Sequence, residues 1–356
     1  MVFVMAGGGT GGHVIPGLAV ARELRQRGHS VLFVGTSRGM EARLVPQAGF
    51  PLRLLRVGAL KQVGWGRRLR TLFELPASFA EAGRILDEAR PQAAFSMGGY
   101  SSGPVTLMAV MKDIPVVIME PNAMPGFAHR LIGPFISRAL LGFERAQRYF
   151  PYGRWEVAGI PIREEFFRIP PKAHQAPFTV LINGGSQGSH RLNTAGTESA
   201  PLWARAGWLD RMIFLHQTGE REYNDVCSRY QQIGARTEVA PFIDDMPAAF
   251  ARADLVVCRS GASAVAELSA AGKASILVPF PFAADQHQLR NAEAMQAVGA
   301  ARVVEDRELT GERLFNELRD LLEAPARLVE MEAAARRLAR PGAAQRAAEV
   351  LEGVGR

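Results

Sequence analysis

Two glycine-rich segments of the chain have the residue types that hold an anion. They are Gly7-Gly8-Gly9-Thr10-Gly11-Gly12-His13 and Gly184-Gly185-Ser186-Gln187-Gly188, and each lies between a short apolar run and a stretch with helical periodicity. A loop of this kind directs backbone N–H groups and the positive end of a helix dipole at one point, which favours phosphate. The two loops predict two similar α/β domains that face one cleft and bind a ligand carrying phosphates.

The first loop matches the common nucleotide-binding motifs only formally. Gly7-x-Gly9-x-x-Gly12 has dinucleotide spacing, but the second expected strand ends in Gly35-Thr36 rather than in the acidic residue that holds a ribose. A P-loop needs Lys and then Ser or Thr after its last glycine, where this chain has His13-Val14. These differences disfavour an NAD(P)-dependent oxidoreductase and a P-loop protein.

His13 is the first candidate for a general base. A neutral imidazole can take a proton from a sugar hydroxyl near pH 7, and a helix N-terminus favours the neutral form. The alternative is that His13 only caps the turn by hydrogen bonding. Glu120, at the end of an expected strand, is the competing candidate base.

Other polar segments also follow expected strands, at the sheet edge where open α/β sheets bind ligands. Ser260 and Gly261 are placed to contact a phosphate, and Glu267, two turns into the next helix, could accept hydrogen bonds from ribose hydroxyls. The remaining candidates are the turn 97–104 with Tyr100 at its tip, the strand end 119–122 and the polar loop 279–291. Each segment alone is more often structural, and their shared position makes them candidates for a site.

The composition is that of a globular, arginine-rich protein. The chain has 356 residues, of which 47% are hydrophobic and 22% charged, and its net charge of +7 comes almost entirely from arginine. Arginine suits phosphate, and a basic surface favours anionic lipid or nucleic acid, although genome composition alone can produce the same bias. Zinc-finger spacing, an aromatic RNA-binding signature and long basic tracts are all missing from the sequence, which disfavours nucleic acid. Two cysteines are too few for a disulfide framework, and no apolar run has the length of a membrane span or the pattern of a signal peptide.

Apolar runs alternate with helical-period stretches in both halves, which predicts doubly wound parallel sheets. The expected strands are 2–5, 31–34, 52–57, 93–96, 116–119 and 139–142, then 178–182, 212–216, 237–240, 255–258, 275–278 and 301–304. Helices are expected to start near Pro16, Gly39, Arg67, Pro104 and Gly126. Prolines and charges between 159 and 177 indicate a linker, so we expect one domain over 1–161 and another over 162–342.

Together and in register, these motifs resemble the MurG family of UDP-N-acetylglucosamine:undecaprenyl-diphospho-muramoyl-pentapeptide N-acetylglucosaminyltransferases. The resemblance runs along nearly the whole chain. It rests on the Thr10–His13 loop, the 97–104 turn, Glu120 with Asn122, Gly159-x-Pro161-x-Arg163, the second glycine loop, Phe242–Met246, Arg259–Ala262 with Glu267, and Gln288 with Asn291. This chain departs from the family at Met119, where a histidine is often found, and at Pro121, which replaces the usual glutamine.

The resemblance implies a GT-B fold, two Rossmann-like domains facing a deep cleft, with a C-terminal helix (343–356) that returns to the N-terminal domain. UDP-N-acetylglucosamine would lie mainly on the second domain, with Ile243 at uracil, Arg163 at the nucleotide and Glu267 at the ribose. The diphosphate would be held by Ser186, Ser260, Gly261 and Ala262. The sugar and the reaction centre would be approached by Thr10, Gly11, Gly12, Asn122 and one of His287 and Gln288. Tyr100, at the tip of the 97–104 turn, is a further candidate for substrate binding. No metal or cofactor is expected, because a helix N-terminus can stabilise the departing UDP.

The leading hypothesis is therefore an inverting glycosyltransferase, peripheral to the cytoplasmic face of the bacterial cell membrane and active in peptidoglycan synthesis. The acceptor 4-hydroxyl of the lipid-linked muramoyl-pentapeptide would attack the anomeric carbon directly, and cell-wall synthesis proteins would be further partners. The alternatives are a transferase with another lipid acceptor such as diacylglycerol, an NAD(P)-dependent oxidoreductase and, last, a non-catalytic nucleotide- or nucleic-acid-binding module.

A basic amphipathic segment suggests how the chain could reach a lipid substrate. On a helix beginning near Gly66, Leu69, Leu72 and Phe73 share one face, and Arg67 and Arg68 flank them. Such a surface suits a bilayer interface with anionic lipid, and Trp65, between two glycines, is typical of such an interface. The alternative is that this apolar face packs on the sheet.

Overall fold

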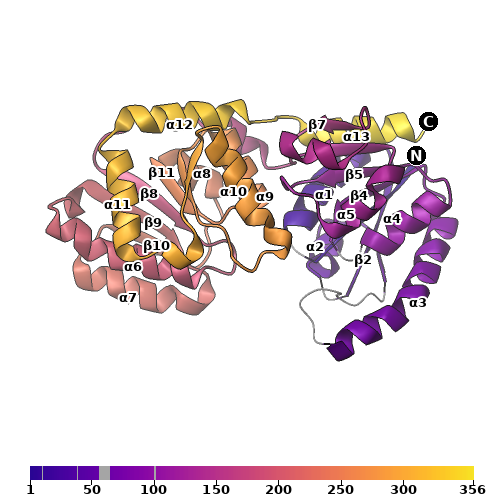
Figure 1. Cartoon of the computed structure of the whole chain (residues 1–356), viewed down its shortest axis with the longest axis horizontal. Helices are drawn as coiled ribbons and strands as arrows, with labels where there is room; N and C mark the ends of the chain where they lie inside the picture. The colour runs from indigo at the N-terminus through magenta and orange to yellow at the C-terminus, as the bar shows by residue number, and fades with distance from the viewer. Residues whose placement is uncertain (10, 38, 56–64, 100–101) are drawn as a thin grey trace. The chain divides into compact units, whose positions relative to one another are not determined.

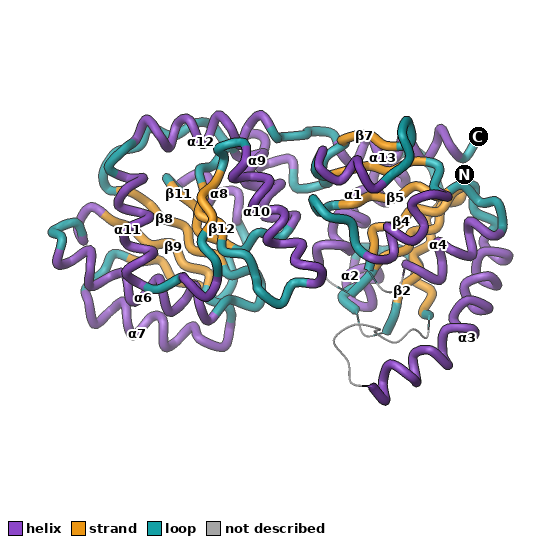
Figure 2. Tube along the Cα trace, in the orientation of Figure 1, coloured by secondary structure: helices purple, strands orange, loops and turns teal. Residues whose placement is uncertain are grey.

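The computed structural model describes residues 1–9, 11–37, 39–55, 65–99 and 102–356. The chain forms two compact units (Figure 1), the first made of Met1–Ile162 with Gly342–Arg356 and the second of Arg163–Pro341. In each unit the strands form a central sheet and helices cover it (Figure 2).

The first unit contains a seven-stranded parallel sheet in the order β3-β2-β1-β4-β5-β6-β7. Its central strands are buried almost throughout, as a parallel sheet covered on both faces requires. The strands are β1 (Val2–Gly7), β2 (Ser30–Gly35), β3 (Leu52–Leu54), β4 (Ala93–Gly98), β5 (Val116–Glu120), β6 (Arg138–Leu141) and β7 (Trp155–Val157). The α-helices are α1 (Gly11–Gln26), α2 (Glu41–Gln47), α3 (Trp65–Ala89), α4 (Ser102–Met111), α5 (Phe127–Ile132) and α13 (Ala343–Val354).

The second unit contains a six-stranded parallel sheet in the order β10-β9-β8-β11-β12-β13. The strands are β8 (Phe178–Asn183), β9 (Met212–Gln217), β10 (Thr237–Ala240), β11 (Leu255–Cys258), β12 (Ser275–Leu277) and β13 (Ala301–Val303). The α-helices are α6 (His190–Arg205), α7 (Tyr223–Ile233), α8 (Met246–Arg252), α9 (Ala262–Ala271), α10 (His287–Ala297), α11 (Gly311–Leu322) and α12 (Pro325–Arg337). Its core is built around Trp203, Phe214 and Tyr230.

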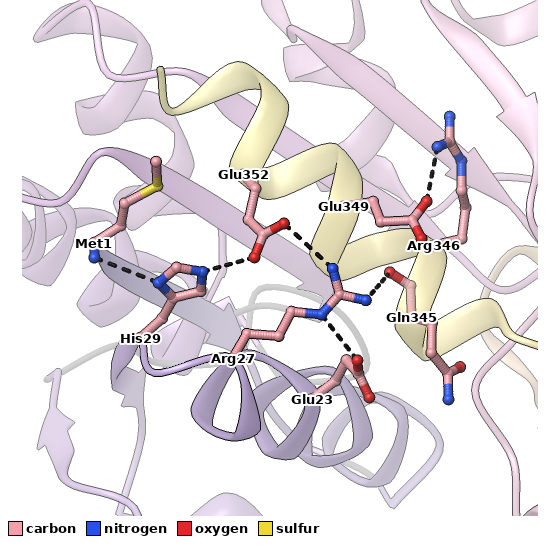
Figure 3. A network of polar contacts seen from close by, with 8 residues as sticks. All are labelled: Met1, Glu23, Arg27, His29, Gln345, Arg346, Glu349 and Glu352. Carbon is pink, nitrogen blue, oxygen red and sulfur yellow. Dashed lines mark hydrogen bonds and ion pairs between the residues drawn. The ribbon is translucent and has the colours of Figure 1, made fainter.

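The last helix, α13, completes the first unit. It packs against α1, and its residues Ala347 and Leu351 are buried in the same core as Phe3. Polar contacts fix its outer side (Figure 3), where the carboxylate of Glu352 lies between His29 and Arg27 at 2.7 and 3.2 Å. Both ends of the described chain therefore belong to the first unit.

The predicted elements agree with the structure except for one strand at a sheet edge and the residues at which helices start. All twelve expected strands form, and β7, a three-residue strand at the sheet edge, was missed because it has too few apolar residues to show a pattern. Helix α1 begins at Gly11, five residues before the start expected at Pro16. Its N-terminus therefore lies within the glycine-rich segment 7–13, and His13 is its third residue.

Candidate active site

The first glycine loop already holds an anion, which is a side chain of this protein. The buried carboxylate of Glu41, the first residue of α2, accepts hydrogen bonds from Gly9 N at 2.8 Å and from Thr36 N and Oγ1 at 2.9 Å each. A Cβ atom at Gly8 or Gly39 would lie within 2.2 Å of this carboxylate, so the glycines make room for it. The prediction that both loops bind phosphate is therefore wrong for the Gly9 amide, since a buried carboxylate occupies it.

The second glycine loop is held by neutral amides. Asn183 Oδ1 accepts from Gly185 N at 2.7 Å and from Gln217 Nε2 at 3.1 Å, and Gln217 Nε2 also donates to Gly185 O. Ser186, at the tip of the loop, is exposed. Among the described residues no carboxylate contacts this loop, which distinguishes it from the first loop.

Glu267, Arg163 and the segment after β10 come together in the second unit. Arg163 donates to the carbonyl of Asp244 at 3.3 Å, and its charge acts on Glu267. Burial raises the pKa of Glu267 to about 7, with Arg163 opposing the shift. Glu267 makes no hydrogen bond to any described residue, so its carboxylate is free to accept from a ligand. The backbone N–H of Ile243 donates to Gln217 Oε1 at 2.8 Å.

The start of α9 offers backbone N–H groups rather than a hydroxyl. Gly261 is the N-cap and Ala262 the first helical residue. Ser260 is fully buried, and its hydroxyl donates to the carbonyl of Gln288 at 2.8 Å, so this hydroxyl is taken. Asn291 Nδ2 donates to Ser260 O and holds the turn against α10. The first-turn amides of α9 are the part of this segment that could meet a phosphate.

His287 and Gln288, the first two residues of α10, each use one polar atom inside the protein. His287 Nδ1 donates to Ala284 O at 2.6 Å, and Gln288 Oε1 accepts from Phe280 N at 3.0 Å. His287 Nε2 and the Gln288 amide NH₂ group are the atoms left for a ligand.

In the first unit, Glu120 is the centre of a buried polar network. Its carboxylate accepts from Asn122 N at 2.9 Å, Asn122 Nδ2 at 3.2 Å, Gly126 N at 3.1 Å and His129 Nδ1 at 2.8 Å. Burial by itself would raise the pKa of Glu120, but the hydrogen bonds from His129, Asn122 and Gly126 outweigh it and hold the pKa below its ordinary value. A carboxylate with four donors and a lowered pKa is a weak base, and its geometry fits it to orient Asn122.

His13 lies beside the turn that follows β4. Gly98 and Gly99 both have φ near +85°, which only glycine adopts without strain. A Cβ at Gly98 would lie 3.2 Å from His129 Cε1 and 3.7 Å from His13 Cδ2, and one at Gly99 would lie 2.5 Å from the carbonyl oxygen of Gly8. The turn therefore packs between the two imidazoles and against the first glycine loop.

Two predicted site residues, Thr10 and Tyr100, lie outside the described residues. Gly11 and Gly12 form the start of α1. Sequence reasoning missed four residues that hold the loops: Glu41, His129, Asn183 and Gln217. The signal for Asn183 and Gln217 was a polar residue at the very end of an apolar strand, whereas Glu41 and His129 lie on helices and carry no such signal.

Two parallel sheets with candidate ligand loops at the carboxyl ends of their strands define a nucleotide-sugar glycosyltransferase of the GT-B type. Residues 3–141 match the glycosyltransferase family 28 N-terminal domain, and residues 179–347 match the C-terminal domain of the same family. A crystal structure of MurG from Acinetobacter baumannii is similar, with a TM-score of 0.83 and 30% identity over 99% of each chain.

Two curated relatives carry the name UDP-N-acetylglucosamine–N-acetylmuramyl-(pentapeptide) pyrophosphoryl-undecaprenol N-acetylglucosamine transferase. The protein from Solibacter usitatus is 54% identical and the alignment covers 99% of this chain and 96% of the relative. The protein from Myxococcus xanthus is 44% identical over 98% of this chain and 92% of the relative. The chain belongs to this family, the MurG glycosyltransferases.

Proposed function

We propose that this chain transfers N-acetylglucosamine from UDP-N-acetylglucosamine to the 4-hydroxyl of undecaprenyl-diphospho-N-acetylmuramoyl-pentapeptide, with inversion at the anomeric carbon. The supporting observation is Glu267, a carboxylate that makes no hydrogen bond to any described residue and that interacts with the charge of Arg163, which itself donates to the Asp244 carbonyl. A ribose with two hydroxyl donors supplies what this carboxylate lacks, and uracil N3–H suits the Ile243 carbonyl. A uridine nucleotide therefore fits this edge of the second sheet.

The diphosphate of the donor fits the second glycine loop and the start of α9. The loop contributes backbone amides and the exposed Ser186, and α9 contributes the N–H groups of Gly261 and Ala262. These groups would stabilise the two negative charges that UDP carries away when the glycosidic bond breaks. We assign the Gln288 NH₂ group as a donor and His287 Nε2 as an acceptor to the hydroxyl and amide groups of the sugar.

His13 is the base we propose for the acceptor hydroxyl. It is half-buried at the N-terminal turn of α1, where the helix dipole favours a neutral ring that can take a proton. Glu120 is the less suitable base because four donors already engage it. We assign Glu120 to the orientation of Asn122, which would contact the sugar or the acceptor.

The test is the release of UDP from UDP-N-acetylglucosamine with a panel of acceptors. We expect release with the lipid-linked muramoyl-pentapeptide and none with diacylglycerol or without an acceptor, and the new linkage should be β. If UDP were released with diacylglycerol and not with the muramoyl-pentapeptide lipid, the acceptor that we propose would be wrong. If the protein did not bind UDP, the proposed donor would be wrong.

We also propose that the first unit faces an anionic membrane. The first unit has 21 Lys and Arg against 12 Asp and Glu, whereas the second unit has 21 against 23. The basic residues are equally numerous, so the basic balance of the chain arises from the scarcity of acidic residues in the first unit. A genome-wide arginine bias does not explain such a difference between two halves of one chain.

An exposed apolar stripe on the first unit supports the proposal that this unit faces a membrane. Phe127 and Leu131 on α5 and Phe135 in the turn after it recur every four residues, and each is more than half exposed. Residues 126–154 carry five arginines and one acidic residue, Glu144. Apolar side chains within a basic surface suit the interface of an anionic bilayer. No helix among the described residues is both long enough and apolar enough to span a membrane.

The segment 57–79 remains a second candidate for this contact. Residues 56–64 lie outside the described residues, and of the residues 65–75 the structure describes only the backbone, as the first turns of α3. Sedimentation with phosphatidylglycerol vesicles separates the two candidates. We expect a loss of binding when Phe127, Leu131 and Phe135 are all changed to Ser, with the exposed Val329→Ser in the second unit as a control. The triple change of Trp65, Arg67 and Arg68 to Ser tests the other segment, and binding retained by both triple variants would contradict the proposed surface.

A further inference from the structure

A serine, a histidine and a glutamate form a continuous buried chain of hydrogen bonds in the first unit. Ser96 Oγ on β4 is 3.0 Å from His129 Nε2 on α5, and His129 Nδ1 is 2.8 Å from Glu120 Oε2 at the end of β5. All three side chains are at most 2% exposed. This burial excludes a role for Ser96 as a nucleophile, because no substrate atom can reach its hydroxyl.

The hydrogen bonds fix where the protons lie. Ser96 Oγ accepts from Gly98 N at 3.2 Å, and the only other polar group that it contacts among the described residues is His129 Nε2. The arrangement that satisfies the Ser96 proton among the described residues has this hydroxyl donating to Nε2. His129 then carries its one ring proton on Nδ1 and donates it to Glu120. Every bond in the chain points from Gly98 toward Glu120.

This chain connects the turn beside His13 with the segment that follows β5. At one end Ser96 holds the amide of Gly98, whose Cα faces the imidazole rings of both His13 and His129. At the other end Glu120 holds the backbone and the side-chain amide of Asn122. Nothing in the sequence joins these segments, which lie on different strands, and His129 is the residue that spans the distance between them.

We propose that His129 is a positioning residue for transfer. As a neutral Nδ1–H imidazole it holds the Gly98–Gly99 turn, which lies beside His13, in a fixed position relative to the Asn122 segment. It does not touch substrate, and it acts through Ser96 and Glu120. This inference rests on the proposed function, in which His13 is the base and Asn122 contacts the sugar or the acceptor.

A matched pair of hydroxyl deletions tests the proposal. Ser96→Ala removes a hydroxyl that is 3.0 Å from the buried His129, and Tyr230→Phe removes a hydroxyl that is 3.0 Å from the buried His216 in the second unit. We expect Ser96→Ala and His129→Gln each to lower kcat about tenfold or more, with the affinity for UDP unchanged. The double variant should lose no more than the worse single variant, because residues that act as one unit are not additive. Tyr230→Phe should lower the melting temperature and leave kcat within twofold.

A purely structural role gives a different pattern. Ser96→Ala would then resemble Tyr230→Phe, with a lower melting temperature and a normal kcat, and this result would overturn the proposal. A loss of UDP affinity equal to the loss of kcat would also overturn it, because the chain of hydrogen bonds lies in the first unit.

The ring proton gives a readout that does not depend on activity. In ¹⁵N-histidine-labelled protein, which has seven histidines, His129 should show the neutral Nδ1–H form. In uniformly ¹⁵N-labelled protein, the Gly98 amide signal should shift in both Ser96→Ala and His129→Gln. An Nε2–H or doubly protonated His129 would refute the arrangement even if the wild-type protein transferred no sugar, and a wild type without transfer would count against the proposed function alone.

Discussion

The two glycine loops share a sequence pattern and differ in what they hold. In the first unit the amide of Gly9 binds the carboxylate of Glu41, and in the second unit the amide of Gly185 binds the neutral amide oxygen of Asn183. A glycine loop with an internal carboxylate repels phosphate, whereas one closed by a neutral amide still attracts it. The comparison suggests the hypothesis that the residue opposite the loop, and not the glycines, decides whether such a loop can bind phosphate.

The partners of the two loops do not follow the net charges of the units that contain them. The first unit has the excess of basic residues, yet its glycine loop is the one occupied by a carboxylate. The second unit is slightly acidic overall and keeps its loop free of a carboxylate among the described residues. Local geometry thus sets ligand binding, and the broad charge of a unit affects which surface or large partner it approaches.

The largest expected effect concerns the base in the first unit. His13→Ala should lower kcat by about two to four orders of magnitude and leave the affinity for UDP near normal, because the base acts on the acceptor and not on the donor. Turnover with the lipid acceptor and UDP binding by calorimetry check this. Unchanged turnover would remove His13 from the mechanism and return the role to Glu120.

Exchanging the chemistry of the two loops tests the comparison directly. Asn183→Asp keeps the size and the two accepted hydrogen bonds but puts a charge at the second loop, as in the first. We expect the affinity for UDP to fall about tenfold or more through charge repulsion, and the affinity for uridine, which has no phosphate, to stay the same.

The reverse change in the first loop serves as the control. Glu41→Gln places an NH₂ group against the N–H donors of Thr36 or Gly9, so the free energy of unfolding should fall by about 1–3 kcal/mol. Its affinity for UDP should not change. An equal loss of UDP affinity in both variants would show that the loops do not differ in the way we describe.

The free carboxylate of the second unit should make donor binding depend on pH. Because burial raises the pKa of Glu267 to about 7, the group is mostly protonated below that pH and ionised above it. Ribose hydroxyls donate to the ionised form, so the affinity for UDP should increase as the pH rises through about 7 and then level off. Glu267→Ala should weaken UDP binding by roughly 1–3 kcal/mol.

Glu267→Gln separates this titration from that of the nucleotide phosphate. The variant keeps the shape of the side chain and should show only the pH dependence that UDP itself brings. If wild type and variant followed the same pH curve, Glu267 would have a structural role in α9 instead.

The smallest expected effect concerns the closing helix of the first unit. The hydrogen bond from His29 holds the pKa of Glu352 below its ordinary value of 4.5. The stabilisation is therefore present above about pH 4.5 and is lost as the pH falls further. Since these side chains are partly exposed, Glu352→Gln should cost at most about 1 kcal/mol near pH 7. Glu349→Gln, which breaks only a pair within α13, should cost less, and thermal unfolding of the two variants compares them.

Sequence patterns determined the strands and the glycine loops of both units. Periodicity and turn residues are local properties, and buried parallel strands such as β8 and β11 appear as short apolar runs, each followed within three residues by a glycine. The sequence did not predict the edge strand β7, because three half-buried residues form no such apolar run. The candidate residues that follow strands, Glu120 and Asn122 among them, could be found for the same reason, since the chain order itself places them at the carboxyl edge of a sheet.

Only the tertiary structure decided what those residues contact. Glu41 reaches Gly9 across 32 positions of the chain, and Ser96 reaches His129 across 33. Such contacts depend on which strands are neighbours and on how a helix packs, and neither is written in local periodicity. The roles of the two loops, the weak basicity of Glu120 and the free carboxylate of Glu267 all follow from these distant contacts, because burial and hydrogen-bond partners are set by the whole fold.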